Sequence, residues 1–220
     1  MTRFDYVRPH PSSHLLSLTD AERIAVGLRR GSLAVLPTET GYMLAALATS
    51  PTAIARAFTA KGRHAANVMH VACASLEMAN TAGVLTPEAL RLLGGLTPGP
   101  VTVIVEKTPL LPDDYVTLNG TVGIRIPDHP ATLQVIAHAG APLTATSLNM
   151  SGTAPSPLAE FDLGTLDWPA DEVTYVVSDD DSIVFDIPST LVRLSDGKLE
   201  ILRVGPIPEP EIRRVAEGQD

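Results

Sequence analysis

A lysine and an arginine stand close together in KGRHAAN, residues 61–67, where an apolar helical pattern ends. Basic residues are scarce in this chain, whose formal charge is −9. The compact ammonium of Lys61 and the planar guanidinium of Arg63 form a pair suited to an anion with several oxygens. A solvated helix end would explain the pair as well, because cations are stabilised beside a helix C-terminus. The stretch therefore indicates either an anion site or an ordinary helix end.

Three further polar groups stand at or near the ends of apolar segments, where α/β folds place their ligands. PTETGY at 37–42 offers the hydroxyls of Thr38 and Thr40, and TSLNMSG at 146–152 offers hydroxyls, an amide and backbone N–H groups. Such groups suit phosphate or ribose oxygens, although ordinary turns have the same composition. Arg125 lies within an apolar strand pattern and needs an acidic side chain or an anionic ligand, because an unpaired buried guanidinium is very costly.

The sequence lacks the usual catalytic signatures: it has no GxxxxGK[ST] phosphate loop, no GxGxxG, no GxSxG and no HExxH. Its 6 histidines are scattered without the spacing of metal ligands, so no metal site made wholly of protein side chains is expected. His70 lies inside an apolar run and is expected on a sheet face or in the core rather than as a base. A nucleophile of the familiar kinds is not indicated.

The polar groups are separated by alternating helix and strand patterns, which predict a layered α/β domain. A capping box of Thr19 and Glu22 and a stop at Gly31 predict the first helix, and Gly62 is expected to end the second in a left-handed conformation. The expected helices cover 20–30, 51–60, 87–93 and 131–140, and the expected strands cover 32–37, 68–74, 101–107, 121–127, 142–147, 174–178, 189–195 and 198–205. Residues 153–172 are expected to form a long loop and 206–220 a loose, Pro-rich charged tail.

Length and composition limit the function classes. With 220 residues and 45% hydrophobic content, the chain has enough apolar mass for a packed core. The single cysteine, Cys73, excludes an intramolecular disulfide and a cysteine zinc cluster and favours the reducing cytoplasm. No apolar run has membrane-spanning length and the N-terminus has no signal-peptide pattern, so neither membrane insertion nor export is expected. A pI of about 5.1 disfavours broad nucleic-acid binding.

Taken in order, the motifs resemble those of the YrdC/Sua5 family, the L-threonylcarbamoyladenylate synthases. The resemblance runs from about residue 20 to residue 205 and predicts one YrdC-like α/β domain over 1–205, followed by the tail at 206–220. Its fold would be a twisted mixed β-sheet flanked by helices with a ligand cleft. The matching motifs are PTETGY at 37–42, Lys61-Gly62-Arg63 with Asn67, PGPVT at 98–102, Arg125-Ile126-Pro127, SLNMSG at 147–152, Ser189-Thr190 and Leu202-Arg203-Val204-Gly205.

The resemblance implies a nucleotidyltransferase that joins L-threonine, bicarbonate and ATP into threonylcarbamoyl-AMP and releases pyrophosphate. This reaction is the first step toward N6-threonylcarbamoyladenosine in tRNA. It implies catalytic roles for Lys61 and Arg63, with Mg2+ carried on the phosphates rather than by a protein metal site. The implied nucleotide-binding residues are Lys61, Arg63, Asn67, Thr121, Ser147, Asn149 and Arg203, and the implied substrate-binding residues are Thr38, Tyr42, Arg125 and Ser189.

The resemblance also implies downstream tRNA-modifying proteins as partners. Direct binding of tRNA is disfavoured by the acidic charge, which includes a stretch from Glu160 to Asp186 without a basic residue. The chain ends close to the end of the resemblance, so a further C-terminal domain is not expected.

The sequence departs from the family pattern mainly around the expected amino-acid pocket. Met43 and Leu44 follow the motif tyrosine where Gly-Leu is usual, and Ala72 stands where a histidine is expected, with His70 two positions earlier. Other departures are His64, Val68 and Leu148. Two alternatives therefore stay open: a YciO-type paralogue that uses another amino acid or carbamoyl compound, and a non-catalytic nucleotide- or RNA-binding module. Salt-insensitive affinity would exclude the RNA-binding version.

Overall fold

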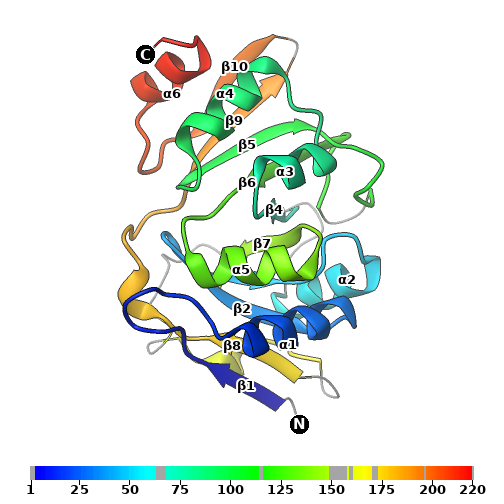
Figure 1. Ribbon diagram of the computed structural model, residues 1–220. Coiled ribbons are helices and arrows are strands. Elements are labelled where there is room, and N and C mark those ends of the chain that lie inside the picture. Colours follow the sequence, from blue (N-terminus) through cyan, green and yellow to red (C-terminus); the bar gives the residue numbers. More distant parts are fainter. Residues whose placement is uncertain are drawn as a thin grey trace.

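A mixed sheet of ten strands forms the centre of the protein in a computed structural model, which describes residues 3–62, 68–113, 116–148, 158, 161–169, 173–195 and 197–219 (Figure 1). Along the sheet the strand order is β1-β8-β2-β3-β7-β4-β6-β5-β9-β10. The strands are β1 Arg3–Val7, β2 Leu33–Thr38, β3 Gly41–Ala45, β4 His70–Ala72, β5 Val101–Glu106, β6 Thr121–Arg125, β7 Leu143–Ser147, β8 Val173–Val177, β9 Thr190–Ser195 and β10 Lys198–Arg203.

Both pairing modes occur in this sheet. The pairs β1–β8, β2–β8, β4–β6 and β5–β9 are parallel, whereas β2–β3, β3–β7, β4–β7, β5–β6 and β9–β10 are antiparallel. The β2–β3 hairpin turns at Glu39 and Thr40, because Thr38 pairs with Gly41. Gly41 has φ +106°, a left-handed value that favours glycine and so allows the tight reversal.

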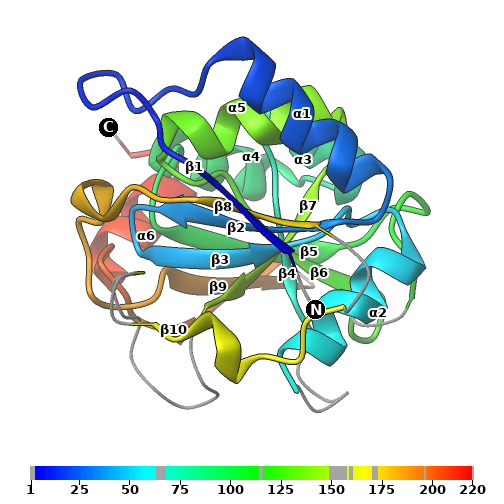
Figure 2. The same cartoon turned by 90° about the horizontal axis from the view of Figure 1, so that it is seen from below.

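The helices cover the sheet and pack against both of its faces. They are α1 Leu18–Arg29, α2 Pro51–Ala60, α3 Leu76–Ala82, α4 Pro87–Leu96, α5 Pro130–Ala139 and α6 Glu209–Ala216, with short 3-10 turns η2 Leu163–Thr165 and η3 Asp180–Ser182. Figure 2 shows α1 and α5 side by side above the central strands, with α2 at the edge of the view. Three of the helices begin with proline, whose fixed φ suits the first helical position.

Two apolar clusters hold these layers together, and β2 contributes to both. Ala34 and Leu36 pack in the cluster that contains α1 and α5, whereas Leu33 and Val35 pack in the cluster that contains α2, α3 and α4. The alternation follows from the period of two in a strand, where successive side chains point to opposite faces. All residues of β2 are buried, so this strand lies in the interior of the protein.

The structure confirms the predicted α/β class, the twisted mixed sheet with flanking helices and the predicted strands. It also confirms the left-handed Gly62 after the second helix, with φ +54°, and the end of the first helix before Gly31. The predicted capping box at Thr19 was wrong. Helix α1 begins one residue earlier, and its N-cap is Ser17, whose side chain accepts a hydrogen bond from the backbone N–H of Asp20.

The predicted loose tail was also wrong for residues 209–216, which form α6. Ile212 of this helix is fully buried, and Val215 approaches Gly95 of α4 so closely that a Cβ there would lie 3.1 Å from its Cγ1. The predicted end of the fourth helix at residue 93 was also wrong, because α4 continues through Gly94 and Gly95 to Leu96. Gly95 leaves space for Val215 of α6 rather than ending the helix.

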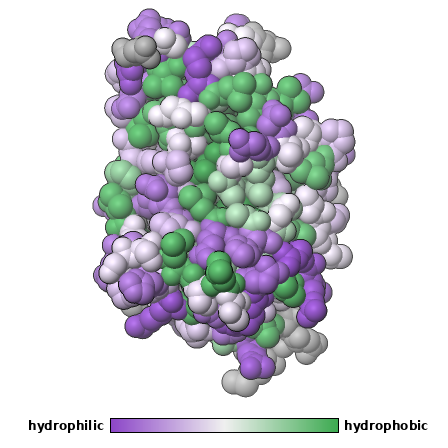
Figure 3. All heavy atoms as spheres, in the orientation of Figure 1, coloured by the Kyte–Doolittle hydropathy of each residue, from purple (hydrophilic) through white to green (hydrophobic). Residues whose placement is uncertain are grey.

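The surface in the view of Figure 1 is divided by polarity. Figure 3 shows apolar side chains gathered over the upper part, where α3 and α4 lie, and polar ones over the lower part around α1. Val84 and Leu90, beside and on α4, are 49% and 45% exposed.

Candidate active site

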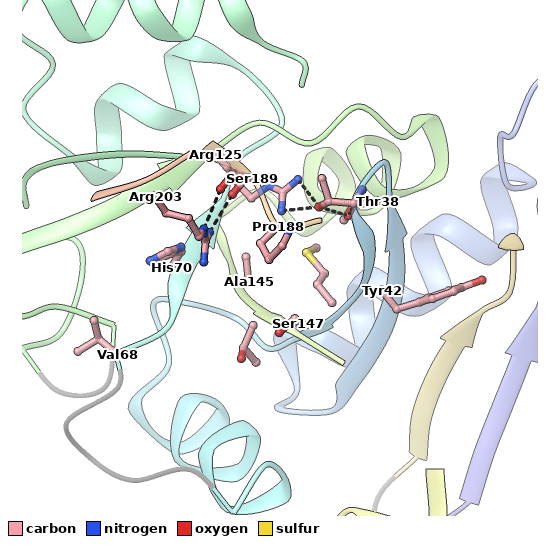
Figure 4. Close-up of a pocket in the computed structure, with 13 residues that line it drawn as sticks. Thr38, Tyr42, Val68, His70, Arg125, Ala145, Ser147, Pro188, Ser189 and Arg203 are labelled. Atoms are coloured by element: carbon pink, nitrogen blue, oxygen red, sulfur yellow. Dashed lines mark hydrogen bonds between the residues drawn. The ribbon is translucent and has the colours of Figure 1, made fainter. Parts of the chain in front are cut away.

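A cavity of about 150 Å³ opens where strands from the middle of the sheet meet the junction before β9. An engineered cavity of roughly this size accommodates a molecule of about the size of benzene, so the space suits a small ligand of amino-acid size. The lining residues are Thr38, Thr40, Tyr42, Met43, Val68, His70, Arg125, Ala145, Thr146, Ser147, Pro188, Ser189 and Arg203. Figure 4 shows Arg125, Ser189 and Arg203 at one side and Val68 and Ser147 at the opposite side.

Arg125, the last residue of β6, is only 9% exposed and finds its partner in the hairpin turn. Its Nη2 lies 2.7 Å from Oε1 of Glu39, and both of its terminal nitrogens lie 3.3 Å from Oγ1 of Thr40. The other oxygen of Glu39 accepts the backbone N–H of Asp128 at 2.9 Å. Of the two partners that the sequence allowed, the structure provides the acidic side chain. Nε of Arg125 is buried without a hydrogen-bond partner in the described part of the chain.

Arg203, at the end of β10, lines the cavity on the same side as Arg125 and contacts Ser189. Its Nε donates to the carbonyl of Ser189 at 3.0 Å and its Nη2 to Oγ of Ser189 at 3.5 Å, while that Oγ lies 2.8 Å from Oγ1 of buried Thr102. Among the residues that the structure describes, no carboxylate lies within ion-pair distance of Arg203. Partial burial lowers the pKa of Arg203 from its ordinary value, and the nearby charge of Arg125 lowers it further. An arginine nevertheless stays charged in proteins, so an anionic ligand would offset the positive charge of Arg203.

The hairpin turn supplies hydroxyls to the same cavity. Thr38 Oγ1 donates to the carbonyl of Gly41 at 2.6 Å and accepts the N–H of Thr40 at 3.2 Å, so the turn holds its own threonines in place. Tyr42 lines the cavity, but its ring points away from the enclosed space in Figure 4. Its hydroxyl accepts the backbone N–H of Asp179 at 2.8 Å, and burial raises its pKa well above the ordinary value. Tyr42 is therefore held as a neutral phenol.

Lys61, which is not a lining residue, contacts the cavity-lining Ser147, and we call this edge of the cavity the rim. Lys61 is the C-cap of α2, and its Nζ donates to the backbone carbonyl of Ser147 at 2.6 Å. Ser147 ends β7 and lies opposite Met43 in the register of β3 and β7. Lys61 thus lies at a helix end and also contacts a residue lining the cavity.

The structure brings together most of the described residues that the sequence predicted for the site: Thr38, Tyr42, Arg125, Ser147, Ser189 and Arg203 line the cavity. Thr121 does not, since it begins β6 at the end remote from Arg125 and donates its hydroxyl to the carbonyl of Leu118 at 2.7 Å. The predicted positions Arg63, Asn67 and Asn149 lie outside the described residues.

Sequence reasoning gave no role to several lining residues, of which His70 is the most informative. It begins β4, is partly buried, and lies over Gly123 of β6, where a Cβ would come within 2.7 Å of its ring. Because His70 and Ala72 are two apart on one strand, they share a face. This shared face, together with the glycine at position 123, was the sequence signal that could have identified His70 as a lining residue. Thr40 and Thr146 also line the cavity and belong to the two polar motifs noted in the sequence, and Val68 was noted as a departure from the family pattern, whereas Ala145 and Pro188 line it without a sequence signal.

Protein carboxylates are scarce around the cavity. None of the described lining residues is acidic, and the nearby Glu39 is already paired with Arg125. A hard divalent cation such as Mg2+ prefers carboxylate, phosphate and water oxygens. These residues therefore do not fit a protein-held Mg2+ site, and Mg2+ would have to arrive on a phosphorylated ligand. Among the described residues, no helix has both the length and the apolar character needed to cross a membrane.

The family model Sua5/YciO/YrdC, whose description reads "telomere recombination", matches residues 27–205. The threonylcarbamoyl-AMP synthase of Pyrococcus abyssi is 33% identical over 200 residues, covering 88% of this chain and 56% of the archaeal protein. The mouse protein of the same name is 36% identical over 195 residues, covering 85% of this chain and 68% of its own length.

Among solved structures, P. abyssi Sua5 complexed with L-threonine superposes with a TM-score of 0.83 at 28% identity, covering 96% of this chain and 60% of that one. The fold and the cavity thus define an α/β protein with a small cavity lined in part by two arginines. This chain belongs to the Sua5/YciO/YrdC family. It spans a little over half the length of the archaeal relatives that it matches.

Proposed function

We propose that this protein is a threonylcarbamoyl-AMP synthase, a nucleotidyltransferase that condenses L-threonine, bicarbonate and ATP into threonylcarbamoyl-AMP and pyrophosphate. The archaeal and mouse relatives carry this name, and the archaeal structure holds L-threonine. The single observation that carries the proposal is a cavity of amino-acid size in which Arg203 has no acidic partner in the described part of the chain and lies beside the Ser189 hydroxyl. We place this activity in the cytoplasm, which suits the single, buried thiol of Cys73.

The proposed reaction needs no protein nucleophile. Bicarbonate loses hydroxide to give CO2, and the neutral amine of L-threonine attacks the CO2 carbon. The proton lost from the nitrogen converts the hydroxide to water as the carbamate forms. A carbamate oxygen then attacks the α-phosphorus of ATP, and the new P–O bond forms as the bond to pyrophosphate breaks. The protein must hold two anions in line and offset their repulsion. Alignment alone supplies on the order of 7–11 kcal/mol in favourable cases, and fixed positive charge adds to this.

The cavity residues divide between the two substrates in this proposal. Thr38, Tyr42, Arg125 and Ser189 surround the amino acid, with Arg203 beside them to meet its carboxylate or the nucleotide. Lys61 and Ser147 at the rim, with Arg63, Asn67 and Asn149, hold the nucleotide phosphates and ribose. We keep Thr121 as a nucleotide contact only if the nucleotide extends beyond the cavity, because it is not one of the lining residues.

The first experiment is to measure pyrophosphate release from ATP and Mg2+ by the full chain, with and without L-threonine and bicarbonate. Mass detection of the adenylate would identify the product. Release that requires both co-substrates is the expected result. The proposal would be overturned if the rate of pyrophosphate release did not depend on threonine, or if ATP bound clearly but no pyrophosphate was released. Arg193→Ala is a matched control for site variants, because Arg193 is an exposed arginine on β9 paired with Glu200.

A second candidate, a relative that uses a different amino acid, rests on the lining side chains of Met43 and Val68. Both are apolar, and Met43 is 3% exposed. This wall of the cavity therefore suits a larger apolar side chain as well as the methyl group of threonine. The same assay with the other standard amino acids separates the two candidates. Faster pyrophosphate release with a larger apolar amino acid than with L-threonine would favour the second.

We also propose that the product passes to downstream proteins that modify tRNA. The acidic balance of the chain, with pI about 5.1, makes direct tRNA binding by this chain doubtful. A filter-binding titration with tRNA at low and physiological salt would test this separately from catalysis, and we expect no retained complex at physiological salt.

A further inference from the structure

His14, His129 and Asp179 meet at a corner of the protein outside the cavity described above. His14 lies in the loop between β1 and α1, His129 is the N-cap of α5, and Asp179 follows β8. Figure 1 shows that loop beside the start of α5 and the segment after β8. His14 and Asp179 are 165 residues apart, and His129 and Asp179 are 50 apart. No local spacing along the sequence could therefore reveal the cluster.

The potential ligand atoms of the cluster converge. Oδ2 of Asp179 lies 2.8 Å from Nδ1 of His14 and 3.1 Å from Nε2 of His129, and one ligand atom from each residue falls within 4.8 Å of the others. A tetrahedral Zn2+ with bonds of about 2.0 Å keeps its ligand atoms roughly 3.3 Å apart. The two separations from Asp179 are about 0.5 and 0.2 Å shorter than this value, and the two histidine nitrogens lie within 4.8 Å of each other, so side-chain shifts would admit an ion.

Burial of the cluster is graded toward solvent. The side chain of His129 is 1% exposed, that of Asp179 11% and that of His14 34%. Nδ1 of His129 is buried and has no partner among the described residues, so Nε2 is the ring atom that serves the cluster. The half-exposed His14 leaves a route for an ion and for a water ligand.

The surrounding backbone positions these side chains. His14 has φ +53°, an uncommon left-handed conformation for a residue other than glycine. A local turn supports it, because the N–H of His14 donates to the carbonyl of His10 and the N–H of His10 donates to the carbonyl of Leu15, both at 2.8 Å. On the other side, the backbone N–H of Asp179 is held by the hydroxyl of Tyr42.

We propose that His14, His129 and Asp179 bind a zinc-class divalent metal ion, with Zn2+ as the reference ion and water in the remaining position. Two imidazoles and one carboxylate are a donor set that zinc accepts, and catalytic zinc sites commonly keep water as the fourth ligand. Bound here, the ion would tie the loop before α1 to the start of α5 and to the end of β8. This inference is independent of the proposed synthase activity.

Hydrogen bonding alone is the competing explanation, since each histidine can donate to the same carboxylate oxygen. The variant His14→Asn separates the two. Asparagine tolerates the left-handed conformation and retains an N–H donor for Asp179, but it is a poor ligand for zinc. His138→Asn is the matched control, because His138 forms a similar but more exposed pair with Glu22 at 3.0 Å.

The experiment titrates Zn2+ into tag-free, chelator-treated full chain by calorimetry and follows Co2+ binding by visible absorption. The expected result is one equivalent of Zn2+, a tetrahedral Co2+ spectrum and a rise in melting temperature with Zn2+. His138→Asn should retain these properties, whereas His14→Asn should weaken Zn2+ binding by at least about tenfold. Asp179→Asn should weaken it similarly wherever the variant folds.

Two results would overturn the proposal. One is wild-type protein that binds no stoichiometric Zn2+. The other is His14→Asn that binds Zn2+ as tightly as wild type, which would place any ion elsewhere on the surface. His14→Asn changes a partly exposed loop residue and should fold normally, so the proposal stays testable even if Asp179→Asn does not fold.

Discussion

Arg125 and Arg203 line the same side of the cavity, but their charges are balanced differently. Arg125 is buried and paired with Glu39 at 2.7 Å, whereas Arg203 is exposed along part of its side chain and binds the carbonyl and hydroxyl of Ser189. A buried charge must be neutralised within the fold, because leaving it unpaired is very costly. A charge at an opening can remain available for a ligand. We therefore expect Arg125 to act mainly on stability and Arg203 mainly on binding.

The largest effect is expected from Glu39→Gln, which leaves Arg125 buried without a counter-charge. Breaking a buried pair from one side costs about 3–5 kcal/mol, and that loss should appear in the free energy of unfolding measured with urea at neutral pH. Glu200→Gln is the control, because it removes the partner of exposed Arg193 at 3.2 Å. That surface pair contributes at most about 1 kcal/mol. Equal losses in the two variants would contradict the distinction between the two arginines.

Lys61→Ala should show the next largest effect, on activity rather than stability. Lys61 lies at the rim, where we propose that it faces the phosphates, and loss of such a charge lowers the rate by roughly 10²–10³. Steady-state pyrophosphate release measures this, and the free energy of unfolding should change by no more than about 0.5 kcal/mol. Lys198→Ala, at an exposed lysine that begins β10, should leave both quantities unchanged. A large stability loss with normal activity per folded molecule would show that Lys61 is structural.

Arg203→Ala should raise KM for L-threonine or ATP by about 10- to 100-fold, the loss expected for a charged hydrogen bond of about 1.5–3 kcal/mol. The free energy of unfolding should change little, in contrast to Glu39→Gln. Which KM rises would show which substrate Arg203 meets. Unchanged KM for both substrates would mean that Arg203 contacts neither substrate and only forms its hydrogen bonds to Ser189.

Ser189→Ala should have the smallest effect. It removes the hydroxyl that contacts Thr102 at 2.8 Å and Arg203 at 3.5 Å, so about 1 kcal/mol of unfolding free energy should be lost. KM should rise only a few-fold, because the backbone carbonyl that receives Nε of Arg203 remains. If Ser189→Ala matches Arg203→Ala in KM, the hydroxyl itself contacts the ligand.

Local signals predicted much of the fold. The helices predicted at 51–60 and 87–93 begin where expected, after the caps Ser50 and Thr86, because a cap and a following proline both act within one turn. Strand β3 was missed because Gly41 and Tyr42 belong to a motif that also reads as a turn, and α6 was missed because its stability depends on Ile212 packing against distant elements. Such contacts have no local signature.

The site shows the same division. The sequence required a partner for Arg125, and the partner lay within the quoted motif at Glu39. Only the folded structure, which puts the β2–β3 turn beside the end of β6, shows that the two side chains meet. The cluster of His14, His129 and Asp179 is the extreme case, since it depends entirely on how the loop before α1, α5 and the end of β8 pack together.

The place of β8 in the sheet has a consequence for synthesis of the chain. Strand β8 lies between β1 and β2 and is parallel to both, so Arg3–Val7 gain a backbone partner only when residues 173–177 are available. At translation rates of about 5–20 residues per second, the first strand waits roughly 10–30 s after it is made. During that interval β1 has no native partner strand. Its pairing with β8 is a late step in folding, because it closes the long stretch of chain between residues 7 and 173.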